Sequence, residues 1–188
     1  MKAHADTRRV PPPLNAQRLH ELALRYVGKY ATTRARLRAY LSRKLRERGW
    51  DDAGEADLEA LASRFGELGY VDDAAYAVSK SRALTARGYG KRRLSDKLRI
   101  DGVDEADGAD AMAHADAEAA NAALRFAERR RLGPFAAASP DPRQRQKWIA
   151  AMVRAGHGFG VARAIAELPP GADVDFGAIG DKAGCTPD

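Results

Sequence analysis

Arginine and lysine are the residues of this sequence whose number and spacing could do chemistry. Nine of them lie in residues 25–48 against one acid, and eight lie in residues 80–99, again against one acid. Guanidinium and ammonium groups at this density bind anions. The residue types alone do not show which anion is bound. It is either phosphate, whose binding weakens steeply as salt rises, or an acidic protein surface.

Acidic residues are separated from these basic residues along the chain. Residues 51–73 hold eight acids and one arginine, and residues 101–118 hold seven acids without any lysine or arginine. Interspersed charges would serve solubility better than this separation does. We therefore expect one basic flank and one acidic flank on the folded protein.

Helical periodicity selects the residues that should form the basic flank. At 100° per residue, each candidate points away from the apolar stripe of its own helix. The candidate partner-binding or nucleic-acid-binding residues are Arg36, Arg43, Arg46, Arg92, Arg93, Arg99, Arg143, Lys147 and Arg154. Base-specific recognition is not expected, because these helices lack the Asn, Gln and Arg combination, on a tight helix-turn-helix, that reads a major groove.

No combination of residues predicts catalysis, a metal or a cofactor. The four histidines are scattered, without a cysteine partner or the i, i+4 spacing of a zinc helix. Gly88-x-Gly90 lacks the Gly-Lys-Ser/Thr ending of a phosphate loop. The carboxylates lie in acidic runs without the apolar surroundings that raise a carboxyl pKa. We therefore expect a protein that is not an enzyme.

The composition predicts that helices position the basic residues. Hydrophobic residues make up 45% of the 188 residues, but alanine supplies many of them and aromatic residues account for only 7%. Alanine together with Leu, Arg, Lys and Glu favours helix, and the alternating Val, Ile and Thr runs of strands are absent. The expected fold class is all-α.

The ends and the overall charge suggest where such a protein works. The N-terminus lacks the apolar core of a signal peptide, and no stretch approaches the roughly 18 apolar residues of a membrane span. The single cysteine, Cys185, excludes a disulfide framework within the chain, and the net charge is +6. We expect a cytoplasmic monomer that makes no contact with a membrane.

A repeated triplet organises the chain. Two large apolar residues and a glycine recur with spacings of four and four, and the triplets begin 53 and 54 residues apart. They are Leu41-Leu45-Gly49, Leu94-Leu98-Gly102 and Trp148-Met152-Gly156. Apolar residues at i and i+4 share a helix face, and a glycine four positions later suits a helix end with positive φ. Each triplet therefore predicts a helix of the same register that ends at the glycine.

Each triplet helix is expected to be the second of three helices in a repeat. Repeats of about 50 residues bury little surface alone, so we expect neighbours to stack into an elongated, curved array. The predicted organisation is a flexible N-terminal tail at 1–13, repeats at 14–71, 72–120 and 121–168, and a flexible C-terminal tail at 169–188. The third helix of the second repeat is mostly alanine, with Met112 as its large apolar residue.

A linked motif runs from the first repeat into the second. It starts with Gly69-Tyr70-Val71-Asp72-Asp73 and continues through Tyr76-Ala77 and Arg87-Gly88-Tyr89-Gly90 to the second triplet. Gly69 can end one helix, while Asp72 or Asp73 accepts hydrogen bonds from the amides that begin the next. The two carboxylates are therefore interpreted as part of a repeat joint rather than as a catalytic pair.

The second half of the motif is interpreted in the same way. Gly88 and Gly90 are expected to serve the connection into the basic helix at Lys91, and Tyr89 either packs in this connection or contacts a partner. The predicted joint residues are Gly69, Tyr70, Asp72, Asp73, Gly88, Tyr89 and Gly90.

As a linked set, this motif resembles the RecX family, whose members modulate the RecA recombinase. The resemblance extends from Glu21 to Leu168 and has the same three-repeat layout. One departure is Gly156-His157-Gly158-Phe159, where the family usually places Phe or Tyr directly after the first glycine. The resemblance implies binding along the groove of a RecA filament on single-stranded DNA, with restraint of ATP hydrolysis, strand exchange and coprotease activity.

Two functions of different classes stay open at this stage. The first is a regulator of the RecA filament, with or without direct contact to single-stranded DNA. The second is a helical nucleic-acid-binding protein that works independently of RecA, which the arginine-rich helices alone would explain.

Overall fold

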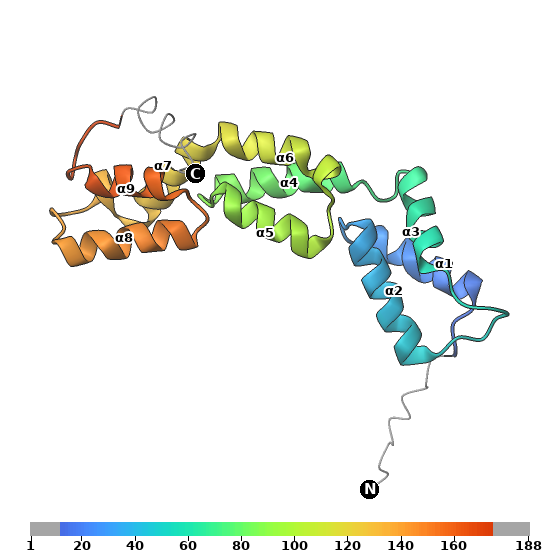
Figure 1. Cartoon of the computed structure of the whole chain (residues 1–188). Helices are drawn as coiled ribbons and strands as arrows, with labels where there is room; N and C mark the ends of the chain where they lie inside the picture. The colour runs from blue at the N-terminus through green and yellow to red at the C-terminus, as the bar shows by residue number, and fades with distance from the viewer. Residues whose placement is uncertain (1–11, 175–188) are drawn as a thin grey trace, which may run out of the picture. The chain divides into compact units, whose positions relative to one another are not determined.

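The computed structural model describes residues 12–174, and all of the regular structure in that range is helical (Figure 1). The all-α prediction is therefore confirmed. The chain divides into two compact units, Met1–Asp72 and Asp73–Asp188. The repeat boundaries and the curved array stay predictions, and residues 1–11 and 175–188 of the expected tails lie outside the described residues. No helix of the described range is long and apolar enough to cross a membrane.

Three capped helices build the first unit. They are α1 (Ala16–Val27), α2 (Arg34–Arg48) and α3 (Leu58–Glu67). The side chains of Asn15, Thr33 and Asp57 each accept a hydrogen bond from the amide three residues later, which satisfies a donor that the first turn leaves open. Leu37 and Leu41 of α2 and Phe65 of α3 are fully buried in the core between the helices.

The second unit contains two groups of three helices. The first group is α4 (Asp73–Ala86), α5 (Lys91–Asp101) and α6 (Glu105–Ala117), and the second is α7 (Ala119–Arg130), α8 (Pro142–Arg154) and α9 (Phe159–Glu167). Each group has its own apolar core: Leu94 and Leu98 are buried in the first, and Met152 and Ile165 in the second.

Small residues let the alanine-rich helix α6 approach α4 closely. Gly108, Ala111 and Ala115 are buried, and the Ser81 hydroxyl of α4 donates a hydrogen bond of 2.8 Å to the Ala111 carbonyl. A side chain can reach a carbonyl of a neighbouring helix only where no large residue separates the two backbones. The lack of large apolar residues in α6 is thus matched by close backbone packing.

The three predicted glycine stops are confirmed. Gly49, Gly102 and Gly156 follow the ends of α2, α5 and α8 with φ of +79°, +71° and +95°. Residues with a Cβ adopt this left-handed region only at a cost. The recurrent glycine of the triplets therefore has the backbone role that the sequence predicts for it.

A contact between two backbones joins the two helix groups of the second unit. The Gly90 amide, just before α5, donates to the Ala155 carbonyl at 3.0 Å, and the Arg92 amide donates to the Gly156 carbonyl at 3.2 Å. A Cβ on Gly90 would lie 2.2 Å from the Gly156 oxygen. We call this contact the glycine joint, and it is possible only because both chain segments carry glycine there.

The side chain of His157 makes a further contact at the glycine joint. Its Nε2 lies 3.1 Å from the Gly88 carbonyl oxygen, and its ring meets the Phe126 ring at 5.6 Å, edge to face. Because the partner is an acceptor, Nε2 carries the proton and donates. Burial lowers the pKa of His157 below its ordinary value of 6.5, while the hydrogen bond to Gly88 opposes that shift. The residue that departs from the family pattern is thus a buried structural histidine.

Substituting Gly90→Ala should destabilise the protein by about 1–3 kcal/mol, because the new methyl group would force the two backbones apart. Gly158→Ala is the matched control, since a Cβ there would meet no atom within 4 Å. Its cost should stay below about 1 kcal/mol, the range of a helix-cap change. Urea unfolding followed by circular dichroism measures both, and equal stability of the two variants would contradict the joint.

The buried histidine should make stability depend on pH. Below pH 6.5 the unfolded chain takes up a proton that folded His157 binds less well, so the free energy of unfolding should fall as the pH decreases from 7.5 towards the lowered pKa. His157→Gln keeps an amide that can donate to Gly88 but does not titrate. Urea titrations at pH 7.5 and 5.5 should show a smaller loss of stability for the variant than for the wild type. An equal loss would assign the pH dependence to other groups.

Candidate functional site

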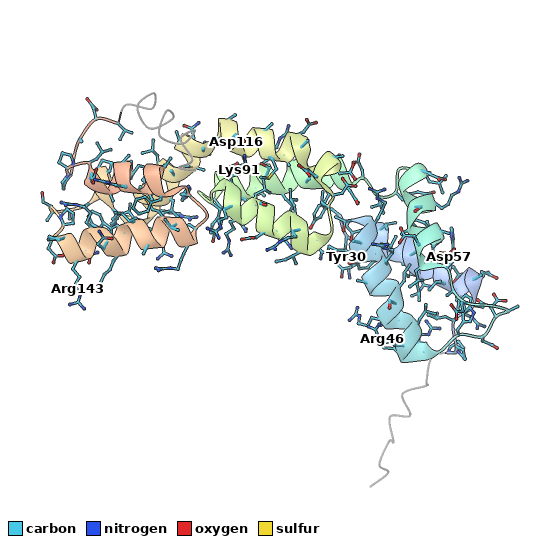
Figure 2. All side chains as sticks on the ribbon, in the orientation of Figure 1. Tyr30, Arg46, Asp57, Lys91, Asp116 and Arg143 are labelled. Atoms are coloured by element: carbon cyan, nitrogen blue, oxygen red, sulfur yellow. The ribbon has the colours of Figure 1, made fainter. Side chains whose placement is uncertain are left out.

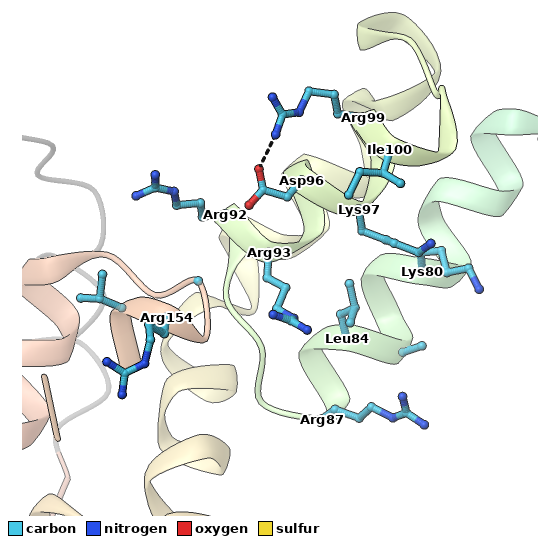
Figure 3. Close-up of a pocket in the computed structure, with 13 residues that line it drawn as sticks. Lys80, Leu84, Arg87, Arg92, Arg93, Asp96, Lys97, Arg99, Ile100 and Arg154 are labelled. Carbon is cyan, nitrogen blue, oxygen red and sulfur yellow. Dashed lines mark hydrogen bonds and ion pairs between the residues drawn. The ribbon is translucent and has the colours of Figure 1, made fainter. Parts of the chain in front are cut away.

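A groove of about 890 Å³ crosses the second unit, lined by residues of α4, α5 and the end of α8 (Figure 3). Seven of its lining side chains are cationic and one is a carboxylate. They are Lys80, Arg87, Arg92, Arg93, Lys97, Arg99 and Arg154, with Asp96 as the acid. We call this cavity the basic groove.

Helix periodicity explains how these residues come to one place. Lys80, Leu84 and Arg87 stand at i, i+4 and i+7 of α4, and so share one face of that helix. On α5 the lining residues recur every three or four positions, on the side opposite the buried Leu94 and Leu98. Arg154 is the last residue of α8, which the glycine joint holds beside the start of α5.

Within the described residues, two of the seven cations pair with a carboxylate and the other five do not. Arg99 donates to Asp96 at 3.0 Å, and Lys97 pairs with the buried carboxylate of Asp101 at 2.7 Å. Within residues 12–174, no carboxylate pairs with Lys80, Arg87, Arg92, Arg93 or Arg154. The basic groove therefore keeps a surplus of positive charge that an anionic partner could neutralise.

Apolar groups lie among these charges. Leu84 and Val153 line the basic groove half-buried, and Ile100 lines it with 75% of its surface exposed. Ile100 is the most exposed large hydrophobic residue of the described range. A partner could thus cover apolar surface as well as meet the cations.

A second cavity, of about 420 Å³, adjoins the basic groove. Its lining includes three aromatic residues, Tyr89, Phe126 and Trp148, and the cations Arg93, Arg130 and Arg154. The Arg93 guanidinium lies 4.9 Å from the centre of the Tyr89 ring, and that of Arg130 lies 5.8 Å from the Phe126 ring. Arg93 and Arg154 line both cavities. We call the smaller one the aromatic cavity.

The structure brings four of the nine predicted basic residues together. Arg92, Arg93, Arg99 and Arg154 all line the basic groove. Arg143 and Lys147 are exposed on α8 but line neither cavity, and Figure 2 shows Arg143 at the start of that helix, directed away from it. That any of these residues binds a partner stays a prediction.

The other three predicted residues belong to α2 of the first unit. Arg43 is exposed, lies over the Tyr40 ring at 5.7 Å and reaches Glu47 at 4.0 Å. Arg46 is exposed and donates to Ser42 at 2.8 Å. Arg36 is half-buried in the third position after the Thr33 cap. These side chains stay separate candidates and do not form part of the basic groove.

The predicted joint residues occupy both ends of α4. Gly69 follows α3 with φ of +74°, and Tyr70 packs on Phe65 with ring centres 5.5 Å apart while 53% of it stays exposed. Asp72 immediately precedes α4, and Asp73 is its first residue and is buried.

The far end of α4 carries the second half of the motif. Gly88 has φ of +73°, and Gly90 forms the glycine joint. Tyr89 packs partly against the core of the second helix group and also lines the aromatic cavity. Packing in the joint and exposure to a partner are therefore not exclusive for this residue.

Two other cations of the basic helices, outside the nine predicted residues, pair with carboxylates of the acidic helices. Lys91 of α5 pairs with Asp116 of α6 at 2.6 Å (Figure 2), and Arg38 of α2 pairs with Glu59 of α3. Opposite charges on neighbouring helices therefore help to hold them together, each exposed pair contributing up to about 1 kcal/mol.

Sequence reasoning missed Lys80, Arg87 and Lys97 as members of the site, and also the aromatic lining around Trp148. The i, i+4, i+7 spacing of Lys80, Leu84 and Arg87 could have indicated a basic stripe on α4. No sequence signal indicates that Trp148 lies near Tyr89, because the two come from different helix groups.

Solved structures share this fold. The crystal structure of RecX from Lactobacillus salivarius superposes with a TM-score of 0.57 over 79% of this chain and 92% of its own, at 18% identity. A second crystal structure of a regulatory protein RecX gives a TM-score of 0.58 over 80% and 70%, at 20% identity. No family model matches the chain. Fold and site thus define an all-helical protein with a groove lined mainly by basic side chains.

Sequence relatives place this protein in a family. Regulatory protein RecX of Myxococcus xanthus is 33% identical over 169 residues, which span 85% of this chain and 90% of the relative. The protein of the same name from Thermobifida fusca is 33% identical over 178 residues, or 92% and 94%. The chain belongs to the RecX family of regulatory proteins, as the linked motif predicted.

The basic groove should bind a simple polyanion. Inorganic polyphosphate should bind the wild type with an affinity that falls as salt rises, and Arg92→Glu/Arg93→Glu should flatten that salt dependence by roughly one unit of log–log slope for each phosphate that is no longer neutralised. Arg82→Glu/Arg129→Glu changes the net charge equally at exposed residues outside both cavities. Titration calorimetry should separate the two variants. The same slope for both would mean that the groove is not the site.

Proposed function

We propose that this protein binds the filament that the RecA recombinase forms on single-stranded DNA. In our proposal it lowers the ATPase, strand-exchange and coprotease activities of that filament during recombination, DNA repair and the SOS response. The observation that carries the proposal is the surplus of cations in the basic groove of a chain that belongs to a family of regulatory proteins. RecA itself comes from the family resemblance.

Electrostatics makes the basic groove a suitable contact for a nucleoprotein filament. A filament on DNA is a long polyanion, and a site with several uncompensated cations would be attracted to it before contact, which raises the association rate. The arginines are already gathered on the helix surfaces around one cavity. Little ordering of backbone would be needed at binding, so less of the interaction energy is spent on it.

Binding alone can restrain the filament. A ligand shifts a conformational equilibrium only by its difference in affinity between the two states. A regulator that binds the less active state ten times more tightly shifts the balance by about 1.4 kcal/mol for each bound copy. The proposed function therefore needs no catalytic group in this protein. We also expect the protein to act in the cytoplasm as a monomer.

The proposed function can be tested on the recombinase itself. Stoichiometric or lower amounts of the wild type should reduce ATP hydrolysis and strand exchange by RecA on single-stranded DNA. Arg92→Glu/Arg93→Glu should require roughly tenfold more protein, because two groove cations become repulsive. The charge-matched Arg82→Glu/Arg129→Glu variant should behave like the wild type. Circular dichroism and thermal unfolding should be nearly the same for all three, since the substituted side chains are exposed.

An alternative is a nucleic-acid-binding protein that works without RecA, and the unpaired arginines of the basic groove would suit it equally. It predicts salt-sensitive binding to naked DNA with no change in the ATPase rate. That pair of results would reject the recombinase regulator.

A further inference from the structure

We infer that the basic groove and the aromatic cavity together form one binding site for single-stranded nucleic acid. The sugar-phosphate backbone would cross the basic groove, and one unpaired base would enter the aromatic cavity. This inference deepens the proposed function, on which it rests for the choice of partner, because it names the anion that the groove binds.

Two shared arginines make the cavities continuous. Arg93 comes from the first turn of α5 and Arg154 from the last turn of α8, and both line the groove and the aromatic cavity. The hydrogen bond from the Gly90 amide to the Ala155 carbonyl, 3.0 Å long, fixes these two helix ends beside each other. A phosphate bound by either guanidinium group would therefore lie next to the aromatic cavity.

The aromatic cavity has the chemistry that binds a base. Trp148 and Tyr89 are half-buried, so each retains exposed ring surface. The Arg93 guanidinium lies 4.9 Å from the centre of the Tyr89 ring, so a cationic plane and an aromatic ring are both present at the cavity. Unpaired bases stack on aromatic rings and on guanidinium planes, and the lining amide of Gln144 can donate to or accept from a base edge.

The same chemistry selects the single-stranded form. In a duplex both faces of each base are covered by its neighbours, so a cavity that takes a base needs a strand whose bases are unpaired. Stacking accepts every base, so we expect little preference for sequence. A peptide of acidic residues alone, such as poly-glutamate, would neutralise the cations and could cover Ile100, but it has no flat group for the aromatic cavity. It is therefore the competing occupant in the test.

Trp148 can report on its own cavity. The chain has two tryptophans, and Trp50→Phe leaves Trp148 as the single one, with unfolding measured to verify that the fold is kept. This variant is titrated with an oligothymidylate, an abasic oligonucleotide of the same length and a poly-glutamate peptide. We expect the oligothymidylate to quench Trp148 fluorescence and to bind about tenfold more tightly than the abasic strand, as one stacked base implies. The abasic strand should bind without quenching.

A variant of the cavity gives the second measurement. Arg130→Ala removes an exposed guanidinium that lines only the aromatic cavity, and Arg129→Ala is its neighbour outside both cavities. The affinity of each variant for labelled thymidylate and abasic strands is measured by fluorescence anisotropy. Arg130→Ala should reduce the difference in affinity between the two strands, whereas Arg129→Ala should leave that difference unchanged.

Equal affinity for the two strands without a change in Trp148 fluorescence would overturn the inference. Tight binding of poly-glutamate that displaces the oligothymidylate, with quenching by neither, would assign the groove to an acidic peptide instead. These titrations contain no recombinase, so their failure is distinct from that of the proposed function. An intact effect on RecA ATPase together with no base-dependent binding would reject this inference and keep the regulator.

Discussion

The contact of one backbone with another at Gly90 and Gly156 is the constraint on which the second unit depends. Neither position has room for a Cβ: one on Gly90 would meet the Gly156 oxygen at 2.2 Å, and one on Gly156 would meet the Arg93 amide nitrogen at 2.5 Å. The joint places the start of α5 against the end of α8. Because Arg93 and Arg154 stand at those two ends, the same contact that joins the helix groups also assembles the basic groove and the aromatic cavity.

Close packing of small residues recurs in this unit and has a consequence for its surface. Helix α6 approaches α4 through Gly108 and Ala111, so the first helix group is held together without many large side chains. Leu94 and Leu98 of α5 complete that core, which leaves the opposite side of α5 to charged residues. The face of α5 opposite this core therefore carries the cations that the proposed function needs.

Charge in this protein has two different roles. Exposed pairs such as Lys91 with Asp116 neutralise cations between neighbouring helices, and they add modestly to stability. Arg92 and Arg154 have no carboxylate partner in the described residues, so their charge is available to the anionic partner that we propose. Because the chain belongs to the RecX family of regulatory proteins, we propose that this charge serves regulation. A binding surface without an obligatory reaction suits a regulator, which changes the balance between states of its partner.

The sequence by itself determined the helices, their stops and the list of candidate cations. Periodicity of apolar residues and the need for positive φ are local properties, so Leu94, Leu98 and Gly102 predict α5 and its end without any tertiary information. Periodicity also shows that Arg92 and Arg99 face away from their own apolar stripe. It cannot show which neighbouring helix they then face, because that depends on the packing angle between elements. Only the tertiary structure therefore decided that Arg93 and Arg154 line the same cavities, that His157 binds the Gly88 carbonyl, and that Trp148 and Tyr89 line one cavity.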